Sequence, residues 1–253
     1  MTTVTSTQCT TRYPIMLVHG VSAKEWTSVR YWGRIPAMLE EAGATVRFAD
    51  HQAARSVRDA ATELATEIDR VVAETGAERV NLIAHSKGGV DSRYAITLLG
   101  RAPKVASLTT ISTPHHGTGY AALLMRWLPW PVKQIIQKWY PWLFRKRTGP
   151  APDLLSLGHD MSPEVCAERN RLMPDAPGVL YRSTGSALAL RRTDGVVPTS
   201  SMRWTGFMGI RRPRGLRGIS HADIVDIAQH DVGGFYVCDF YRDLVMGLKE
   251  VGL

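Results

Sequence analysis

A serine followed by two glycines stands directly after an apolar run, in the segment IAHSKGG at residues 83–89. Residues 80–84 are expected to form a buried strand and residues 88–99 a helix. Ser86 would then lie on a tight strand-to-helix turn, where small neighbours allow close approach and the helix dipole favours negative charge. Ala84 takes the place where glycine is usual, and it is still small. The segment predicts a nucleophilic serine, with a purely structural serine as the alternative.

A serine hydroxyl is a weak nucleophile near neutral pH, so it needs a histidine base that is itself oriented by an acid. After a serine on such a turn, the acid and then the histidine are expected further along the chain. Asp194, in RRTDGVVP, follows the last predicted strand, and His221, in GISHAD, precedes the last predicted helix. We therefore predict Ser86 as the nucleophile, Asp194 as the acid and His221 as the base.

The other histidines and aspartates are weaker candidates by position. His19 and His85 belong to the first loop and to the serine turn, and His115 and His116 stand in TPHHGT; loop-orienting hydrogen bonds are expected of them. The remaining histidines lie in polar loops: His51, His159 and His230. The remaining aspartates considered either precede the last predicted strand or accompany and follow the histidine: Asp153, Asp160, Asp175, Asp223, Asp226 and Asp231.

Acyl transfer also places negative charge on a carbonyl oxygen, which backbone N–H groups can stabilise. One such donor is expected from Lys87, directly after the nucleophile, and the other from Val21 in the loop HGV that follows the first strand. The Lys87 side chain is expected to be solvated at the start of the helix.

The elements that position these residues alternate along the chain, which predicts one α/β domain over residues 1–253 with a mainly parallel sheet. Strands are expected at 14–18, 44–50, 80–84, 105–113 and 178–185, and helices at 55–74, at 88–99 and from 236 onward. The alternation stops after Pro114, so residues 117–160 are interpreted as an insertion at the functional edge of the sheet, with regular structure resuming at 178.

The insertion mixes aromatic and basic residues, which suits an interface with lipid. We expect it to act as a lid, although its aromatic residues could instead pack it onto the core. The residues concerned include Trp127, Trp130, Trp139 and Trp142. Stacking on single-stranded nucleic acid is a further use of such residues, but the complete triad makes it improbable, and no nucleic-acid partner is expected. A second basic cluster at 203–217 is interpreted as an exposed loop, and its contact with lipid headgroups is left open.

Composition sets few limits. The hydrophobic fraction of 44% and the charged fraction of 21% are those of an ordinary globular protein. The net charge of +8 would suit nucleic acid, an anionic membrane surface or an acidic substrate, and charge alone does not choose between them. The three cysteines have no metal-ligand spacing and favour reduced thiols over disulfides. No stretch reaches the roughly 20 apolar residues of a membrane span. The polar N-terminus shows no apolar core of a signal peptide, so cytoplasmic placement is weakly expected, although a leader could be missing.

Several segments together resemble the bacterial triacylglycerol lipases, within the α/β-hydrolase superfamily: LVHG, VNLIAHSKGG, SRYAI, TTISTPHHGT, TDGVVP and GISHADIVD. The resemblance is densest over 13–119 and from 178 to the end. It implies an α/β-hydrolase fold, with Ser86, Asp194 and His221 as the triad and Val21 and Lys87 as oxyanion donors.

The sequence departs from that family in three respects. Ser200 and Ser201 stand where some secreted relatives carry a cysteine of a disulfide. Many relatives hold a structural calcium between two aspartates. Asp223 stands at the position of one of these ligands, but the connector SALALRRT contains no aspartate for the other. No cofactor is therefore expected, and calcium remains the alternative. Secretion is usual in the family, and no leader is visible here.

The leading hypothesis is therefore a carboxylic ester hydrolase, a lipase that forms an acyl-enzyme on Ser86. The alternatives are a carboxylesterase, thioesterase or phospholipase, which share the machinery, and a non-catalytic module that binds a membrane or a partner. The expected partner is a lipid or ester substrate, with contact to a membrane or lipid-droplet surface. The sequence does not give the chain-length preference, compartment or oligomeric state.

Overall fold

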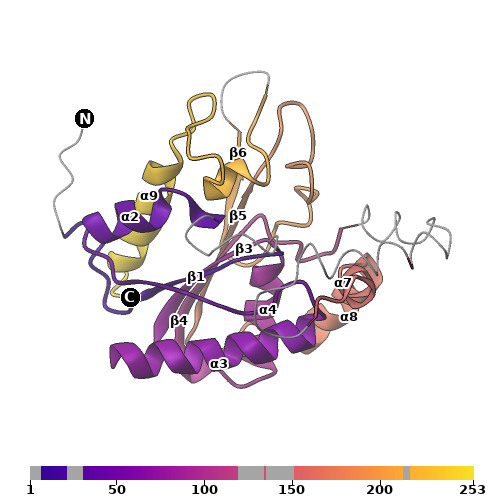
Figure 1. Cartoon of the computed structure of the whole chain (residues 1–253), viewed down its shortest axis with the longest axis horizontal. Helices are drawn as coiled ribbons and strands as arrows, with labels where there is room; N and C mark the ends of the chain where they lie inside the picture. Colours follow the sequence, from indigo (N-terminus) through magenta and orange to yellow (C-terminus); the bar gives the residue numbers. More distant parts are fainter. Residues whose placement is uncertain (1–6, 22–30, 119–133, 135–150, 213–216) are drawn as a thin grey trace.

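The computed structural model describes residues 7–21, 31–118, 134, 151–212 and 217–253. A six-stranded sheet, ordered β2-β1-β3-β4-β5-β6 with every neighbouring pair parallel, runs through the centre of the molecule (Figure 1). Its strands are β1 (Ile15–Val18), β2 (Val46–Phe48), β3 (Val80–His85), β4 (Val105–Ile111), β5 (Leu180–Ser186) and β6 (Phe207–Arg211). The predicted α/β architecture with a mainly parallel sheet is confirmed.

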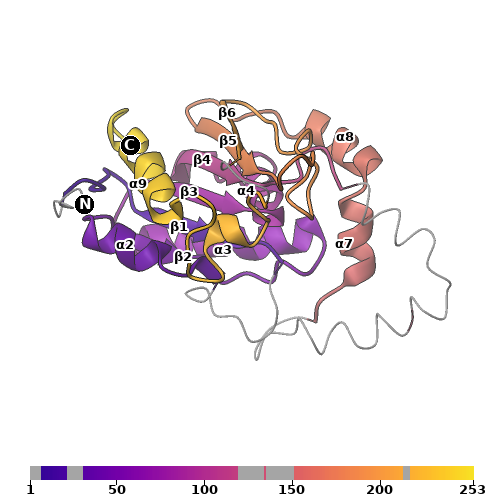
Figure 2. The ribbon, with the colours of Figure 1, turned by 90° about the horizontal axis from the view of Figure 1, so that it is seen from above.

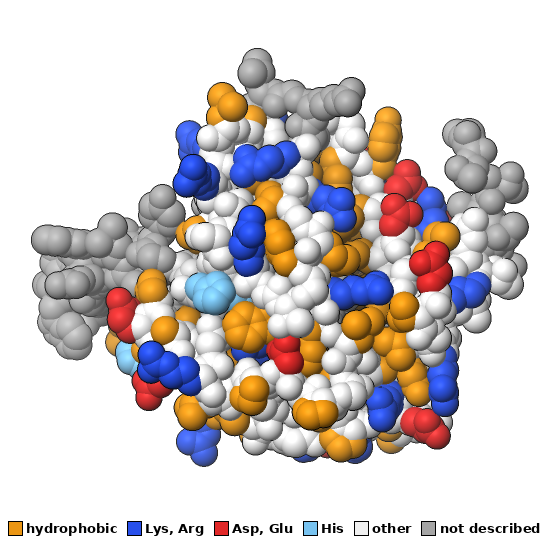
Figure 3. All heavy atoms as spheres, turned by 180° about the vertical axis from the view of Figure 1, so that it is seen from behind, with side chains coloured by type: hydrophobic (Ala, Val, Ile, Leu, Met, Phe, Trp, Pro, Cys, Tyr) orange, Lys and Arg blue, Asp and Glu red, His pale blue; other side chains and the backbone are white. Residues whose placement is uncertain are grey.

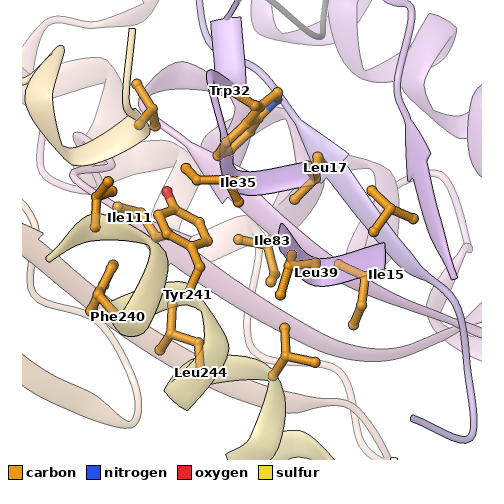
Figure 4. Close-up of a cluster of buried hydrophobic side chains, with 14 of the residues drawn as sticks. Ile15, Leu17, Trp32, Ile35, Leu39, Ile83, Ile111, Phe240, Tyr241 and Leu244 are labelled. Carbon is orange, nitrogen blue, oxygen red and sulfur yellow. The ribbon is translucent and has the colours of Figure 1, made fainter. Parts of the chain in front are cut away.

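The sheet is covered by helices on both faces because successive side chains of a strand point in opposite directions. Ile15 and Leu17 of β1 join a buried cluster with α2 (Ile35–Glu41) and α9 (Val237–Lys249), shown in Figure 4. Met16 and Val18 join a second cluster. That cluster includes side chains of α3 (Val57–Thr75) and α4 (Lys87–Thr97). Strands buried on both faces read as continuous apolar runs, which is why β1 and β3 were visible in the sequence.

The ends of α3 follow from local chemistry. The Ser56 side chain accepts a hydrogen bond from the N–H of Asp59, and Gly76 ends the helix with φ +66°, a left-handed conformation that glycine adopts at little cost. The predicted helix at 55–74 is therefore confirmed within two residues. The predicted strands and the other two predicted helices are confirmed as well, with shorter ends in β2 and β4.

The sequence interpretation missed several elements. Residues 207–211 of the supposed exposed loop 203–217 form edge strand β6, whose side chains are all half-buried. Regular structure does not resume at 178: α7 (Leu154–Asp160) and α8 (Pro163–Leu172) come first. The Ser162 side chain caps α8 by accepting from the N–H of Val165, so the start signal was present. The polar surface of α8 hid its periodicity, since only Cys166 of that helix is buried.

The carboxyl ends of the parallel strands meet at one edge of the sheet, where the loops after β1, β3, β4 and β5 converge. In Figure 2, α7 and α8 lie at one end of the molecule, and α2 and α9 lie at the other. Among the described residues, no helix is long and apolar enough to cross a membrane.

Candidate active site

Ser86 lies between β3 and α4 in a conformation that non-glycine residues rarely adopt, with φ +57° and ψ −135°. Its N–H donates to the carbonyl of Ile111 in β4 at 2.9 Å. A side chain at Gly88 would begin 2.5 Å from the carbonyl oxygen of His19, and one at Gly89 would overlap the Thr113 side chain. The two glycines are therefore required for α4 to approach β1 and β4, which holds Ser86 in its strained turn.

The structure brings His221 and Asp194 to this serine. His221 Nε2 lies 2.9 Å from Ser86 Oγ, and His221 Nδ1 lies 2.7 Å from Asp194 Oδ2. The serine and the histidine are separated by 135 residues along the chain, and the histidine and the aspartate by 27. The predicted nucleophile, base and acid thus form one hydrogen-bonded row.

Asp194 is buried and held firmly. Its Oδ1 accepts hydrogen bonds from the N–H groups of Val196 and Val197, at 3.0 and 2.8 Å, which leaves Oδ2 for the histidine. The Asp194 carbonyl also accepts from the His221 N–H at 2.9 Å. The aspartate therefore fixes both the ring and the backbone of His221, and a proton on Nδ1 leaves Nε2 as the acceptor for the serine hydroxyl.

The loop after β1 lies against the nucleophile. A Cβ at Gly20 would fall 2.6 Å from Ser86 Cβ, so only glycine allows this approach. Val21 follows and is half-buried, and Lys87 provides the first helical N–H after the serine. Val21 and Lys87, the predicted oxyanion donors, thus belong to the two segments that meet at Ser86.

Tyr31 links this loop to His85, whose ring lies against His221, and the sequence interpretation missed this tyrosine. Its buried hydroxyl oxygen accepts from the Gly20 N–H at 3.1 Å and lies 2.6 Å from His85 Nδ1. Burial lowers the pKa of His85 well below its usual value, so the ring is neutral and its Nδ1 accepts a hydrogen bond from the Tyr31 hydroxyl. The His85 ring centroid lies 4.4 Å from that of His221. A tyrosine in YW, 11 residues after the loop glycine, gave no signal of this role.

We expect Tyr31→Phe to lower kcat by roughly 10- to 100-fold with little change in KM, because a misplaced oxyanion loop weakens transition-state binding. The ring would still pack, so the melting temperature should fall only slightly. Steady-state kinetics on a soluble ester would check this, with Tyr94→Phe as the control. An unchanged kcat would show that the Tyr31 hydroxyl does not position the loop.

The Lys87 side chain contradicts the expectation that it is solvated. It is buried, and its Nζ donates to both oxygens of Asp91, one turn further along α4, at 2.7 and 2.9 Å. His51 Nε2 lies 3.7 Å from Asp91 Oδ2. Burial raises the pKa of Asp91 to about 6 even though Lys87 opposes the shift. The helix start faces the interior because α4 packs beneath the serine, and the i,i+4 pairing neutralises the buried charge.

We expect Lys87→Met to destabilise the fold by about 3–5 kcal/mol, because it leaves the Asp91 carboxyl buried without its partner. The double variant Lys87→Met/Asp91→Leu should recover most of this loss. Denaturant unfolding of both variants would measure it. A single variant as stable as the unmodified chain would show that the pair contributes nothing.

Three other histidines make hydrogen bonds outside the Ser86–His221–Asp194 arrangement. His115 Nε2 donates to Thr110 Oγ1 at 2.9 Å, and His116 Nε2 donates to the Arg203 carbonyl at 3.1 Å. His19 Nδ1 donates to the Gly20 carbonyl at 2.7 Å. Each of these contacts orders a loop, as expected from their positions.

Asp223 does not fit the calcium alternative. Its carboxylate accepts from the Ser220 N–H at 2.9 Å and from the Arg217 guanidinium at 3.2 and 3.3 Å, so it is already neutralised. Within the described part of the chain, no three His, Cys, Asp or Glu side chains gather into a metal site. The four tryptophans predicted as lid residues, Trp127, Trp130, Trp139 and Trp142, lie outside the described residues.

Comparison with known protein families gives a match over residues 14–151 to the family described as palmitoyl protein thioesterase. Triacylglycerol lipases of Pseudarthrobacter phenanthrenivorans and Burkholderia plantarii are each 40% identical over 121 residues, which is 46% of this chain. The matched stretches span 37% and 33% of those relatives, or about a third of their length.

Solved structures share the fold at low identity. A Bacillus licheniformis lipase in its mature form superposes with a TM-score of 0.65 at 17% identity, covering 92% of this chain and 91% of that one. A metagenomic carboxyl esterase gives a TM-score of 0.70 at 12% identity, covering 96% and 77%. At these identities the likeness concerns the fold.

Proposed function

Because the chain belongs to the palmitoyl protein thioesterase family, we propose that it is a serine hydrolase that cleaves carboxylic esters of lipids, in the manner of a triacylglycerol lipase. The observation that carries the proposal is the row Ser86–His221–Asp194, with hydrogen bonds of 2.9 and 2.7 Å on a strained strand-to-helix turn. The curated bacterial relatives named triacylglycerol lipase favour a lipid ester as substrate.

In the proposed acylation step, Ser86 Oγ attacks the ester carbonyl carbon while its proton passes to His221 Nε2. The imidazolium that forms is stabilised by Asp194, which is buried and accepts from Nδ1. His221 then gives the proton to the leaving alkoxide, so that the alcohol departs and the acyl group remains on Ser86. Charge on the carbonyl oxygen would be met by the N–H groups of Val21 and Lys87, each such donor being worth on the order of 10²–10³ in rate.

In the proposed deacylation step, a water takes the place of the alcohol. His221 Nε2 removes a proton from this water as it attacks the acyl carbon, and the same proton returns to Ser86 Oγ when the C–O bond breaks. The products are a carboxylic acid and the free enzyme, and no metal or redox cofactor is needed for the balance.

The same machinery could cleave a thioester, and the description of the matched family gives a specific reason to test this second candidate. Thioester cleavage differs only in the leaving group, a thiolate that needs less protonation than an alkoxide. A thioesterase should therefore depend less on His221 as an acid than a lipase does. A non-catalytic binding module is disfavoured, because the geometry of the row would then serve no purpose.

The test is hydrolysis of p-nitrophenyl and glycerol esters of increasing acyl length, with and without an emulsion, alongside matched S-acyl thioesters. We expect kcat/KM for long-chain esters to rise above the short-chain values when an emulsion is present. A preference for soluble short esters would identify a carboxylesterase, and a preference for thioesters a thioesterase. Failure to cleave any of them would contradict the proposal.

A further inference from the structure

The two loops that flank β6 combine exposed arginines with an exposed leucine beside the proposed triad. Residues 187–218 contain seven arginines, no lysine and one acidic residue, Asp194, which is buried. We use the name arginine rim for the described and exposed members of this set. Its arginine and apolar side chains are Leu190, Arg191, Arg192, Val196, Arg203, Arg212 and Arg217.

Leu190 is unusual among the described apolar side chains. It is 98% exposed, and its backbone φ of +48° lies in the left-handed region, which disfavours a leucine by roughly 1–2 kcal/mol. Val196, on the same loop, is 51% exposed. Neither the exposure of Leu190 nor its left-handed backbone stabilises the isolated fold. A favourable contact of Leu190 with a binding partner would explain both features.

Backbone contacts hold the rim in place. Leu188 donates its N–H to the Thr193 carbonyl at 2.9 Å, and Ala189 donates to the Arg217 carbonyl at 3.1 Å. A side chain at Gly218 would overlap the backbone of Ala189, so the two loops touch where only glycine fits. The Arg212 guanidinium also donates to the Arg191 carbonyl at 3.1 Å. Leu190 is therefore presented at the tip of a braced loop.

The charges of the rim lack internal compensation. Arg217 pairs with Asp223, but within the described chain no acidic side chain forms an ion pair with Arg191, Arg192 or Arg212. Guanidinium groups bind phosphate oxygens through paired N–H donors. Seen from behind, the upper part of the molecule carries Lys and Arg side chains with hydrophobic atoms between them (Figure 3), and in Figure 1 the loops around β6 lie above the strand ends.

We propose that the arginine rim docks this chain on an anionic phospholipid bilayer, with Leu190 inserted among the acyl chains and the arginines on the phosphates. Charge complementarity selects this partner, and Leu190 adds an apolar contact that a polar polyanion would not use. This docking proposal depends on the proposed function in one respect, namely that the substrate is held in the lipid surface. The Asp194 loop then places the triad at that surface.

The experiment measures binding to vesicles of phosphatidylcholine with 40% phosphatidylglycerol at low salt, using the Ser86→Ala chain so that the lipid stays intact. Arg191→Gln/Arg192→Gln should weaken partitioning by about 25-fold, since each basic residue near such a surface contributes about 1 kcal/mol, or roughly fivefold. The control Arg58→Gln/Arg171→Gln makes the same charge change on α3 and α8 and should weaken partitioning by less than threefold.

A second variant separates insertion from stability. Asparagine tolerates left-handed backbone better than leucine, so Leu190→Asn should keep or raise the melting temperature while lowering vesicle affinity several-fold. Equal binding to pure phosphatidylcholine vesicles, or equal losses in the rim and control variants, would overturn the proposal. Tighter binding of a single-stranded oligonucleotide than of the vesicles, lost on the same arginine changes, would overturn it in favour of a nucleic-acid surface.

These outcomes do not depend on catalysis. If the wild-type chain hydrolyses no ester but binds anionic vesicles through the arginine rim, the proposed function fails and the docking proposal stands. If it hydrolyses soluble esters but binds such vesicles no better than neutral ones, the docking proposal fails alone.

Discussion

Replacing Ser86 by alanine should lower kcat for ester hydrolysis by roughly 10⁶-fold, the scale on which loss of a triad nucleophile acts. The change removes the hydroxyl oxygen that lies 2.9 Å from His221 Nε2 and is the proposed nucleophile. It leaves the turn intact, because the Ser86 N–H still donates to the Ile111 carbonyl and alanine fills the same space. Burst and steady-state kinetics on a p-nitrophenyl ester would measure the loss, and the melting temperature would remain close to that of the wild type.

Ser92 provides a matched control. It is a buried serine of the same helix, and its Oγ donates to the Gly88 carbonyl at 2.7 Å. Ser92→Ala should therefore reduce stability slightly and leave kcat within a few-fold of the wild-type value. Activity of Ser86→Ala above roughly one per cent of wild type would contradict the nucleophile assignment.

Asp194→Asn is expected to lower kcat by about 10⁴-fold with the fold preserved. The reason lies in the carboxylate geometry: Oδ1 accepts from the N–H groups of Val196 and Val197, so the amide oxygen would stay there. The amide NH₂ would then face His221 Nδ1 and donate to it. This places the imidazole proton on Nε2, where it faces Ser86 and cannot accept the hydroxyl proton.

Asp223→Asn is the control for that change, because Asp223 is a buried aspartate two residues beyond His221 that contacts Arg217 and Ser220. We expect its kcat to stay within tenfold of the wild-type value. Measuring kcat from pH 6 to 10 for both variants would compare them. If Asp194→Asn and Asp223→Asn lowered kcat equally, Asp194 would act by holding the loop in place and not by fixing the tautomer of His221.

The hydrogen-bonded arrangement of Ser86, His221 and Asp194 could be predicted because strongly patterned elements carry these residues in a fixed order. Ser86 comes after a continuous apolar strand, and His221 stands just before an amphipathic helix. The strained backbone at Ser86 also follows from the two glycines nearby. Each of these patterns lies within a short segment of the chain, so a single sequence is enough to predict the structure from it.

Contacts between distant segments could not be predicted in the same way. Tyr31 meets His85 across 54 residues, and no local pattern marks that pairing. Lys87 was expected to be a solvated helix-start lysine, although Asp91 at i+4 was a visible partner; its burial depends on how α4 packs beneath the serine turn. Edge strand β6 was missed because its half-buried side chains give no clear alternation.

Labelling with a fluorophosphonate, followed by mass-spectrometric mapping of the modified peptide, would show directly whether Ser86 is the nucleophile. The reagent phosphonylates a serine that a neighbouring base has activated, so its target identifies the nucleophile independently of the natural substrate. We expect one adduct, on Ser86 within IAHSKGG; it should be absent in Ser86→Ala and form much more slowly in His221→Ala. An adduct on another serine, or labelling that persists in Ser86→Ala, would contradict this expectation.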